Sequence, residues 1–299
     1  MRISVTLLLV LAAAIFGAPL ITDHERAAGI APDAINFELL GPPDAPLVVL
    51  IHGVSGPMMV WDRTVELLST NGFRTLRFDL YGRGASGRPP DGQYGLPQYL
   101  AELDRVLTLA QVPPDAPLML VGSSMGAMIA SEFTSLHPER VAALALIGPA
   151  GFPLKASPLA KLLEVPTVGD WAMRVFGDAS LAAHDRRYYF APERFRAFQA
   201  RFEEQLRIAG SKHAILMTLR NAPVQGYLEG YDRVGKTAVP KLVIWGREDQ
   251  AFPYDNHLKL MPRLPGARLV TVEQAGHLPQ VEQDQITGPA LLAFLRDKK

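Results

Sequence analysis

A serine stands at the centre of a glycine-flanked motif at residues 122–126, whose sequence is Gly-Ser-Ser-Met-Gly. The motif follows an apolar run at 118–121 and precedes a helical pattern that starts near Met125. Such a sharp strand-to-helix turn strains the backbone of its central residue and exposes the side chain, and the glycines remove groups that would collide there. The spacing therefore predicts Ser124, and not its neighbour Ser123, as a nucleophile.

A serine hydroxyl is a weak nucleophile and needs a base. Of the seven histidines, His277 follows a predicted strand at 267–272, in a loop at the carboxyl end of that strand. In an open α/β sheet the ligand crevice lies beyond these strand ends. We therefore expect His277 to be the base. The other histidines lie in segments with no such relation to a strand end, apart from His52, which is treated below: His24, His137, His184, His213 and His257.

The acid that orients a base of this kind is expected between the serine and the histidine in chain order. Asp249 fits, because it closes the segment Gly-Arg-Glu-Asp after an apolar strand at 242–245. Its neighbour Glu248 is expected to be solvated. The earlier strand at 141–147 ends in Gly-Pro-Ala and offers no competing acid. Asp249 would hold the imidazole tautomer and stabilise the imidazolium.

The loop His52-Gly53-Val54 follows the apolar strand at 47–51. A glycine there lets the backbone approach a substrate closely. We expect the backbone N–H groups of Val54 and Met125 to form an oxyanion hole. His52 is interpreted as a residue that fixes the loop.

A second glycine pattern, Gly-Arg-Gly-Ala-Ser-Gly at 82–87, matches a dinucleotide-binding fingerprint. That chemistry requires a helix to begin at the motif, and the Arg-Pro-Pro at 88–90 prevents one. The loop is therefore interpreted as structural, and no cofactor is expected. The sequence has no H-E-x-x-H motif and no histidine pair at ligand spacing, so no metal site is expected either.

The elements that must position these residues alternate along the chain. Fully apolar runs are typical of strands buried on both faces, and helical patterns fall between them. This alternation predicts a doubly wound, mostly parallel α/β sheet. The expected strands are 47–51, 73–79, 118–121, 141–147, 242–245 and 267–272, and the expected helices are 61–70, 96–111, 125–137 and 285–296.

Residues 151–238 break the alternation, because helical patterns occur there without a convincing strand. This range is predicted to be a helical cap over the crevice, with the core formed by 23–150 and 239–299. A stripe of apolar residues at helical spacing is interpreted as packing rather than as substrate contact. It consists of Phe195, Phe198, Phe202 and Leu206.

Composition sets broad limits. Hydrophobic residues make up 48% of the 299 residues, which is enough for a large core. Basic and acidic residues number 30 each, so charge gives no reason to expect nucleic acid as a partner. There is no cysteine, which excludes disulfides and thiol catalysis.

The N-terminal segment carries information on compartment. Arg2 is followed by an uncharged, mostly apolar stretch at 3–21. Residues 1–22 are therefore predicted to be either a cleaved signal peptide or an uncleaved membrane anchor with Arg2 on the cytoplasmic side. Both interpretations place the catalytic body outside the cytoplasm, membrane-anchored or secreted (periplasmic).

Taken in order, these pieces resemble the α/β-hydrolase superfamily across residues 35–296. The matching segments also include Asp-Leu-Tyr-Gly-Arg-Gly-Ala-Ser at 79–86. The resemblance implies a cofactor-free Ser-His-Asp hydrolase under a helical cap. An apolar leader on such a body is similar to the membrane-associated monoacylglycerol-lipase branch. Dehalogenases and epoxide hydrolases of this fold use an aspartate nucleophile, and Ser124 argues against both.

The sequence thus predicts hydrolysis of a carboxylic ester through an acyl-enzyme, and the apolar cap favours an apolar acyl or aromatic substrate. The loop at 52–57 also resembles that of carbon–carbon bond hydrolases with the same triad. Hydrolysis of a carbon–carbon, lactone, thioester or amide bond, or cofactor-free perhydrolysis, therefore stays open. A catalytically silent binding protein on this scaffold is the third alternative.

Overall fold

The computed structural model describes residues 29–153 and 163–297 of the chain. The predicted leader, residues 1–22, lies outside these residues. Within the two described ranges, no helix has the length and hydropathy needed to cross a membrane.

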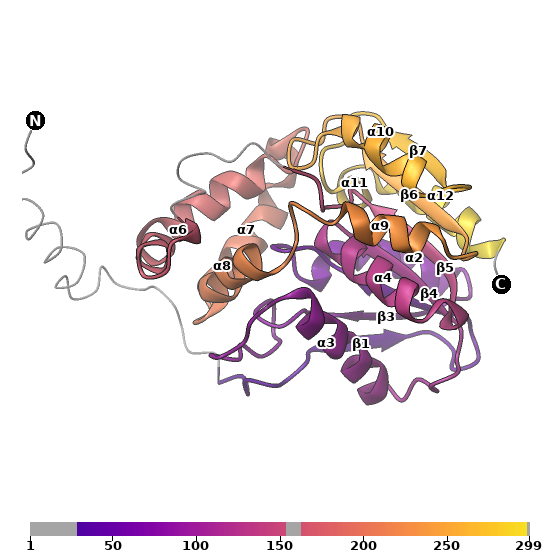
Figure 1. Cartoon of the computed structure of the whole chain (residues 1–299), viewed down its shortest axis with the longest axis horizontal. Helices are drawn as coiled ribbons and strands as arrows, with labels where there is room; N and C mark the ends of the chain where they lie inside the picture. Colours follow the sequence, from indigo (N-terminus) through magenta and orange to yellow (C-terminus); the bar gives the residue numbers. More distant parts are fainter. Residues whose placement is uncertain (1–28, 154–162, 298–299) are drawn as a thin grey trace, which may run out of the picture.

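A seven-stranded sheet forms the centre of the fold, with the strand order β1-β3-β2-β4-β5-β6-β7 (Figure 1). All neighbouring strands run parallel except β1, which is antiparallel to β3. This confirms the predicted α/β fold with a mostly parallel sheet. The strands are β1 (Phe37–Leu40), β2 (Leu47–Ile51), β3 (Arg74–Phe78), β4 (Leu118–Ser123), β5 (Val141–Ile147), β6 (Lys241–Gly246) and β7 (Arg268–Val272).

Helices cover both faces of the sheet. Successive side chains of a strand point to opposite faces, and in β2 Val49 and Ile51 pack with α3, α4 and α9, whereas Val48 and Leu50 pack with α2 and α12. Burial on both sides explains why these strands lack polar alternation. The helices of these layers are α2 (Asp62–Thr70), α3 (Leu96–Leu109), α4 (Met125–Leu136), α9 (Leu228–Gly235), α10 (His257–Leu260), α11 (Pro279–Glu282) and α12 (Asp284–Arg296).

The edge strand β1 was not predicted. It has four residues, all of them at least partly exposed, and its sequence Phe-Glu-Leu-Leu has no strand-like alternation. Only pairing with β3, from Phe37 opposite Phe78 to Leu40 opposite Thr75, makes it a strand.

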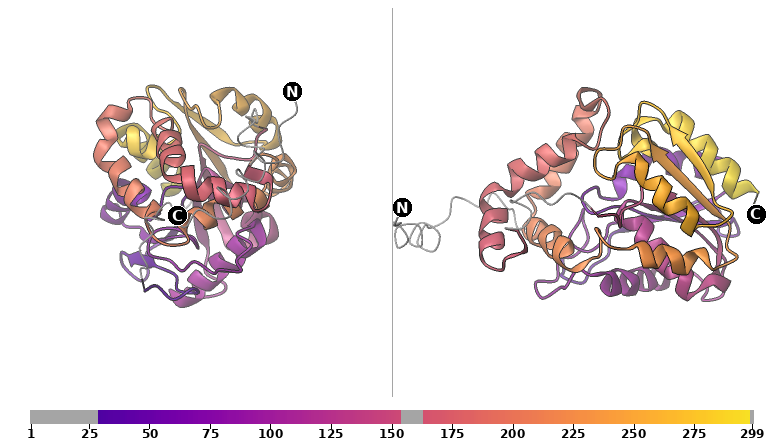
Figure 2. Two further views of the ribbon diagram at one scale, coloured as in Figure 1. Left: turned by 90° about the vertical axis from the view of Figure 1, so that its left-hand side faces the viewer. Right: turned by 45° about the horizontal axis from the view of Figure 1, so that its top comes forward.

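Three helices between β5 and β6 stand apart from the sheet layers: α6 (Val168–Arg186), α7 (Arg196–Leu206) and α8 (Ser211–Asn221). Figures 1 and 2 show them gathered on one side of the core. The described part of 151–238 contains no strand. Helix α9 also lies in this range, but it packs on α4, and its Tyr231 and Val234 belong to the same hydrophobic cluster as the central strands. By its packing, α9 is part of the core layer, and α6–α8 form the cap layer.

Candidate active site

Ser124 lies between the end of β4 and the start of α4, with φ 55° and ψ −118°. A positive φ is strained for a residue with a side chain, and it persists only where neighbouring structure enforces it. Here the Ser124 N–H donates to the Ile147 carbonyl at 2.9 Å. A Cβ on Gly126 would come within 2.1 Å of the Ile51 carbonyl oxygen, so the helix packs on β2 only because residue 126 is glycine. The turn predicted from the motif is therefore present.

Asp249 and His277 form a buried pair. Nδ1 of His277 lies 2.8 Å from Oδ2 of Asp249, and the two residues are 2% and 5% exposed. The other carboxylate oxygen accepts the N–H groups of Ala251 (2.8 Å) and Phe252 (2.9 Å), and Trp245 Nε1 donates to Oδ2 at 3.1 Å. These donors stabilise the negative charge of the carboxylate. The carboxylate in turn holds the proton of the imidazole on Nδ1, which leaves Nε2 able to accept a proton.

Ser124 and His277 line one narrow cavity, whose volume is only about 10 Å³. Among the described residues, no hydrogen bond joins the Ser124 hydroxyl to the imidazole. Catalytic hydrogen bonds are often long without substrate and tighten in the complex. The structure thus brings two of the predicted residues into contact and places the third in the wall of the same cavity.

The neighbouring Glu248 is not simply solvated, as the sequence had suggested. Its Oε2 accepts the N–H of Ala275 at 3.1 Å. This bond ties the loop after β6 to the loop that carries His277, because the two strands are neighbours in the sheet.

The loop after β2 faces the nucleophile. Gly53 and Val54 line the cavity, and Met125 is the first residue of α4, where backbone N–H groups have no partner within the helix. The oxyanion hole formed by Val54 and Met125 stays a prediction. Burial lowers the pKa of His52 to about 4. On the neutral ring, Nε2 accepts the N–H of Leu80, and Nδ1 lies 2.8 Å from the carbonyl oxygen of Gly53. His52 therefore fixes this loop, in line with its interpretation from the sequence.

Arg83, from the loop at 82–87, fixes the same segment from the other side. Its buried guanidinium donates to the Val54 carbonyl (2.7 Å) and to Thr218 Oγ1 of the cap helix α8 (2.8 Å). It also donates to Tyr99 Oη at 2.8 Å. Turns occupy 81–86, and the next helix begins only at Leu96. The loop thus has the structural role expected for it and connects the oxyanion loop to the cap.

Gly53→Ala is expected to lower kcat/KM about a hundredfold, the cost of a displacement of about 1 Å in a catalytic site. A Cβ on Gly53 would lie 2.9 Å from Ser124 Cβ and 3.4 Å from Oγ, so the loop and the nucleophile would have to separate. Steady-state hydrolysis of an activated ester measures the effect. Gly226→Ala is the matched control, because its Cβ would meet no atom within 4 Å. Full activity of Gly53→Ala would contradict the close approach of Gly53 to Ser124.

The cap supplies the other wall of the cavity. Tyr188 Oη accepts the Ser55 hydroxyl at 3.3 Å, and the Tyr188 ring lies 4.9 Å from that of His277. Phe198 and Phe202 also line the cavity. Phe202 and Leu206 belong to one buried hydrophobic cluster, and Phe198 packs against it, in line with the interpretation of the stripe as packing. Phe198 and Phe202 therefore both pack within the cap and form part of the cavity wall.

Glu282 joins the cap to the loop of the catalytic histidine. Its two carboxylate oxygens accept the N–H groups of Gly276 (2.8 Å) and Phe190 (2.7 Å), and the side chain is 8% exposed. Burial raises the pKa of Glu282 to about 7, against the hydrogen bonds from Phe190 and Gly276, which lower it. Below its folded pKa the group is protonated in the folded state.

This shift makes stability depend on pH. Between about 4.5 and 7 the unfolded chain has released the proton and the folded protein has not, so the free energy of unfolding falls as pH rises. Glu282→Gln removes the titrating carboxyl. We therefore expect the decrease in the free energy of unfolding with rising pH to become smaller by up to about 3 kcal/mol. Urea unfolding at pH 5 and pH 8 measures it. Glu273→Gln, at an exposed ion pair with Arg247, should keep the native dependence. If the free energy of unfolding changed equally between pH 5 and pH 8 in the native protein and in Glu282→Gln, Glu282 would not be the source of the pH dependence.

Sequence reasoning missed Tyr188, Glu282 and Asp185, and it left the partners of Arg83 unidentified. Tyr188, Glu282 and Asp185 belong to no motif at a strand end. Arg83 alone carried a signal, since it is a charged residue inside the segment at 79–86 that the α/β-hydrolase resemblance had identified. The others are at the site because the cap lies over it.

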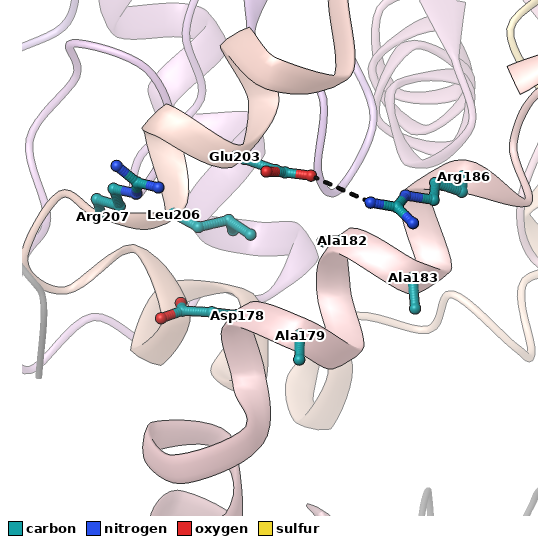
Figure 3. Close-up of a pocket in the computed structure, with 8 residues that line it drawn as sticks. All are labelled: Asp178, Ala179, Ala182, Ala183, Arg186, Glu203, Leu206 and Arg207. Carbon is teal, nitrogen blue, oxygen red and sulfur yellow. Dashed lines mark ion pairs between the residues drawn. The ribbon is translucent and has the colours of Figure 1, made fainter. Parts of the chain in front are cut away.

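A second, more open hollow lies on the outer side of the cap, between α6 and α7 (Figure 3). Asp178, Ala182 and Arg186 of α6 line it, and Arg186 faces Glu203 of α7 at 4.0 Å. None of the predicted catalytic residues lines this hollow. The narrow cavity at Ser124 is therefore the candidate active site.

Comparisons with known proteins show the family of this chain. A family model described as the alpha/beta hydrolase fold matches residues 46–284. The 2-hydroxy-6-oxononadienedioate/2-hydroxy-6-oxononatrienedioate hydrolase of Cupriavidus pinatubonensis is 30% identical, with 84% of this chain and 87% of that protein covered. The 2-hydroxymuconate semialdehyde hydrolase of Pseudomonas putida is 31% identical, with 78% and 81% covered.

Solved structures agree in fold. The enol-lactonase of Burkholderia xenovorans superposes with a TM-score of 0.75 at 22% identity, covering 91% of this chain and all of that one. An esterase of Exiguobacterium antarcticum gives 0.74 at 20% identity, covering 89% and 99%. With the family match over most of its length and a Ser-His-Asp arrangement at the strand ends, the chain belongs to the alpha/beta hydrolase family.

Proposed function

We propose that this hydrolase cleaves carboxylic esters through an acyl-enzyme formed on Ser124. The observation that carries the proposal is the cavity that Ser124 shares with the buried His277–Asp249 pair. Ser124 sits on a strained turn in the wall of this cavity, with the N terminus of α4 behind it. This arrangement suits acyl transfer.

In the proposed reaction the Ser124 hydroxyl attacks the ester carbonyl while His277 Nε2 takes its proton. The N–H groups of Val54 and Met125 stabilise the oxyanion, and Asp249 stabilises the imidazolium without being protonated. His277 then gives the proton to the leaving alcohol. In the second half, His277 activates a water molecule that releases the acid and restores the serine.

The walls of the cavity support an uncharged substrate with an apolar acyl or aromatic part. Val60, Phe198, Phe202 and Leu278 supply aliphatic and aromatic surface beside Ser124. Asp185 adds a carboxyl group, and a second negative charge placed against it would be disfavoured. Such a small ester is the partner that we propose, with no role for nucleic acid.

The second candidate is hydrolysis of a carbon–carbon or lactone bond by the same residues. Two relatives support a carbon–carbon bond: the protein of Cupriavidus pinatubonensis is named a 2-hydroxy-6-oxononadienedioate hydrolase, and that of Pseudomonas putida a 2-hydroxymuconate semialdehyde hydrolase. The structural neighbour named an enol-lactonase supports a lactone bond. Thioester or amide hydrolysis and perhydrolysis need the same nucleophile and base, so they belong to this candidate.

Rates on a panel of p-nitrophenyl esters with short, medium and long acyl chains, together with a vinylogous diketone, separate the two candidates. The proposal expects ester turnover that varies with chain length and is lost in Ser124→Ala. Turnover of the diketone with no ester hydrolysed would overturn it in favour of the second candidate.

Labelling by a fluorophosphonate probe tests the third alternative, a silent binding protein on the same scaffold. We expect the probe to label the native protein and to leave Ser124→Ala unlabelled. An unlabelled native protein would favour the binding protein.

We also propose that the catalytic body acts outside the cytoplasm, anchored or released according to whether the apolar segment at 3–21 is cleaved. Mass spectrometry of the mature N terminus tests this. A start near Ile15, directly after the Ala-Ala-Ala cleavage pattern at 12–14, indicates a cleaved signal peptide, and an intact segment indicates an anchor. Recovery of the intact protein from the cytoplasm alone would contradict both.

A further inference from the structure

A carboxyl group that the catalytic steps do not use lies in the wall of the active-site cavity. Asp185 stands in the last turn of α6, and it lines the cavity together with Ser124 and His277. Its neighbour Arg186 lines the outer hollow instead (Figure 3). The end of α6 therefore lies between the two spaces, with Asp185 in the wall of the cavity at Ser124 and Arg186 in the wall of the other hollow.

One oxygen of this buried carboxyl lacks a hydrogen-bond partner among the described residues. Asp185 is 4% exposed, and among the residues that the structure describes its Oδ2 has no hydrogen-bond partner. Buried polar atoms are nearly always paired, and an exception in a cavity calls for an explanation. A ligand that enters the cavity and supplies the missing hydrogen bond is such an explanation.

Its position ties this group to the catalytic base. The Tyr188 N–H donates to the Asp185 carbonyl at 2.9 Å, and the Tyr188 carbonyl accepts the His277 N–H at 2.6 Å. The backbone of residues 185–188 therefore fixes the position of Asp185 in the cavity wall and also holds the loop that carries His277. A substrate held by Asp185 would have a defined position relative to His277.

The charged and titratable neighbours determine which form of the carboxyl meets a ligand. Burial, followed by the like charge of Glu203, raises the pKa of Asp185 to about 7, and Arg186 acts against this shift. Tyr188 and Tyr189 are the phenols on the same turn. Near neutral pH the protonated and the ionised forms are therefore both populated.

A hydroxyl group is the partner that fits both forms. It accepts from the protonated carboxyl and donates to the ionised one, whereas an ether or ketone oxygen pairs only with the protonated form. A substrate carboxylate would be repelled by the ionised form.

We propose that Asp185 is a specificity-determining residue that hydrogen-bonds a hydroxyl group of the substrate, so that the enzyme selects neutral, hydroxyl-bearing esters. The proposal rests on the ester hydrolysis proposed above and names the substrate class of that same site.

One purely structural role competes with this. Tyr189 Oη is also buried without a partner among the described residues, and Asp185 is close enough to influence its titration. A rotation that paired the two side chains would satisfy both. Tyr189→Phe separates the roles, because Tyr189 does not line the cavity.

The test uses two pairs of esters that differ by one hydroxyl. Butyl butyrate against its 4-hydroxybutyl counterpart places the hydroxyl in the alcohol part. p-Nitrophenyl butyrate against its 3-hydroxy derivative places it in the acyl part. For the native protein, kcat/KM is expected to favour the hydroxyl ester in at least one pair by about tenfold, which corresponds to about 1.4 kcal/mol.

Asp185→Leu is expected to bring this ratio to about one, since it removes both donor and acceptor. Asp185→Asn keeps a donor and an acceptor in the same volume and should retain most of the preference. Tyr189→Phe should keep the native ratio. If the leucine variant does not fold, Asp185→Ala gives the same measurement.

Fluorophosphonate labelling of each variant shows whether the nucleophile still works. Native protein that is labelled and hydrolyses esters without a hydroxyl preference overturns this inference and leaves the proposed function standing. A preference that survives in Asp185→Leu, or one that is lost in Tyr189→Phe, also overturns it. Native protein that is neither labelled nor active on any ester removes the proposed function and this inference with it.

Discussion

Ser124→Ala is expected to lower kcat/KM for ester hydrolysis by about 10⁶-fold, the loss that follows removal of a serine nucleophile from a Ser-His-Asp site. The substitution deletes one hydroxyl from a turn whose backbone is held by Ile147 and by the packing of Gly126 on β2. The fold should therefore be unchanged, and the loss should appear in kcat rather than in the amount of folded protein.

Two measurements make this result decisive. Thermal unfolding of the variant should match that of the native protein, and labelling by a fluorophosphonate should disappear. Ser123→Ala is the matched control, because Ser123 is the neighbouring buried serine, with its Oγ 3.2 Å from Gln280 Nε2. Residual activity of Ser124→Ala near the native level, or a comparable loss in Ser123→Ala, would refute Ser124 as the nucleophile.

Asp249→Asn is expected to lower kcat by about 10⁴-fold. The carboxylate accepts the N–H groups of Ala251 and Phe252 on Oδ1, and Trp245 and His277 on Oδ2. An asparagine has only one carbonyl oxygen, so its NH₂ group must face either the two backbone N–H groups or the imidazole. In the second orientation the NH₂ donates to Nδ1, and the proton of the imidazole moves to Nε2, where the base must be free.

The measurement is the pH dependence of kcat on an activated ester. The kcat of the variant should stay about 10⁴-fold below that of the native protein at the pH where the native protein is most active. Asp255→Asn is the control, because it is an exposed aspartate that follows the same strand. Near-native activity of Asp249→Asn would show that another group orients His277.

Local sequence was sufficient for the parts of this protein that depend on neighbours in the chain. The apolar runs of β2, β4, β5 and β6 can be satisfied only by burial on both faces, which requires a parallel sheet covered by helices. The motif at 122–126 predicted the strained turn at Ser124 because strand, glycines and helix are contiguous. The positions of Asp249 and His277 followed from the rule that strand ends meet at one edge.

Tertiary structure alone decided the wall that faces these residues. Asp185, Tyr188 and Glu282 acquire their environments from contacts between the cap and loops far away in the chain, such as Phe190 with Glu282 and Ser55 with Tyr188. A periodic pattern tells which face of α7 is apolar, and it does not tell whether that face meets another helix or a cavity. The orientation of the cap is set by the sum of such distant contacts, so the substrate-facing residues became visible only in the folded chain.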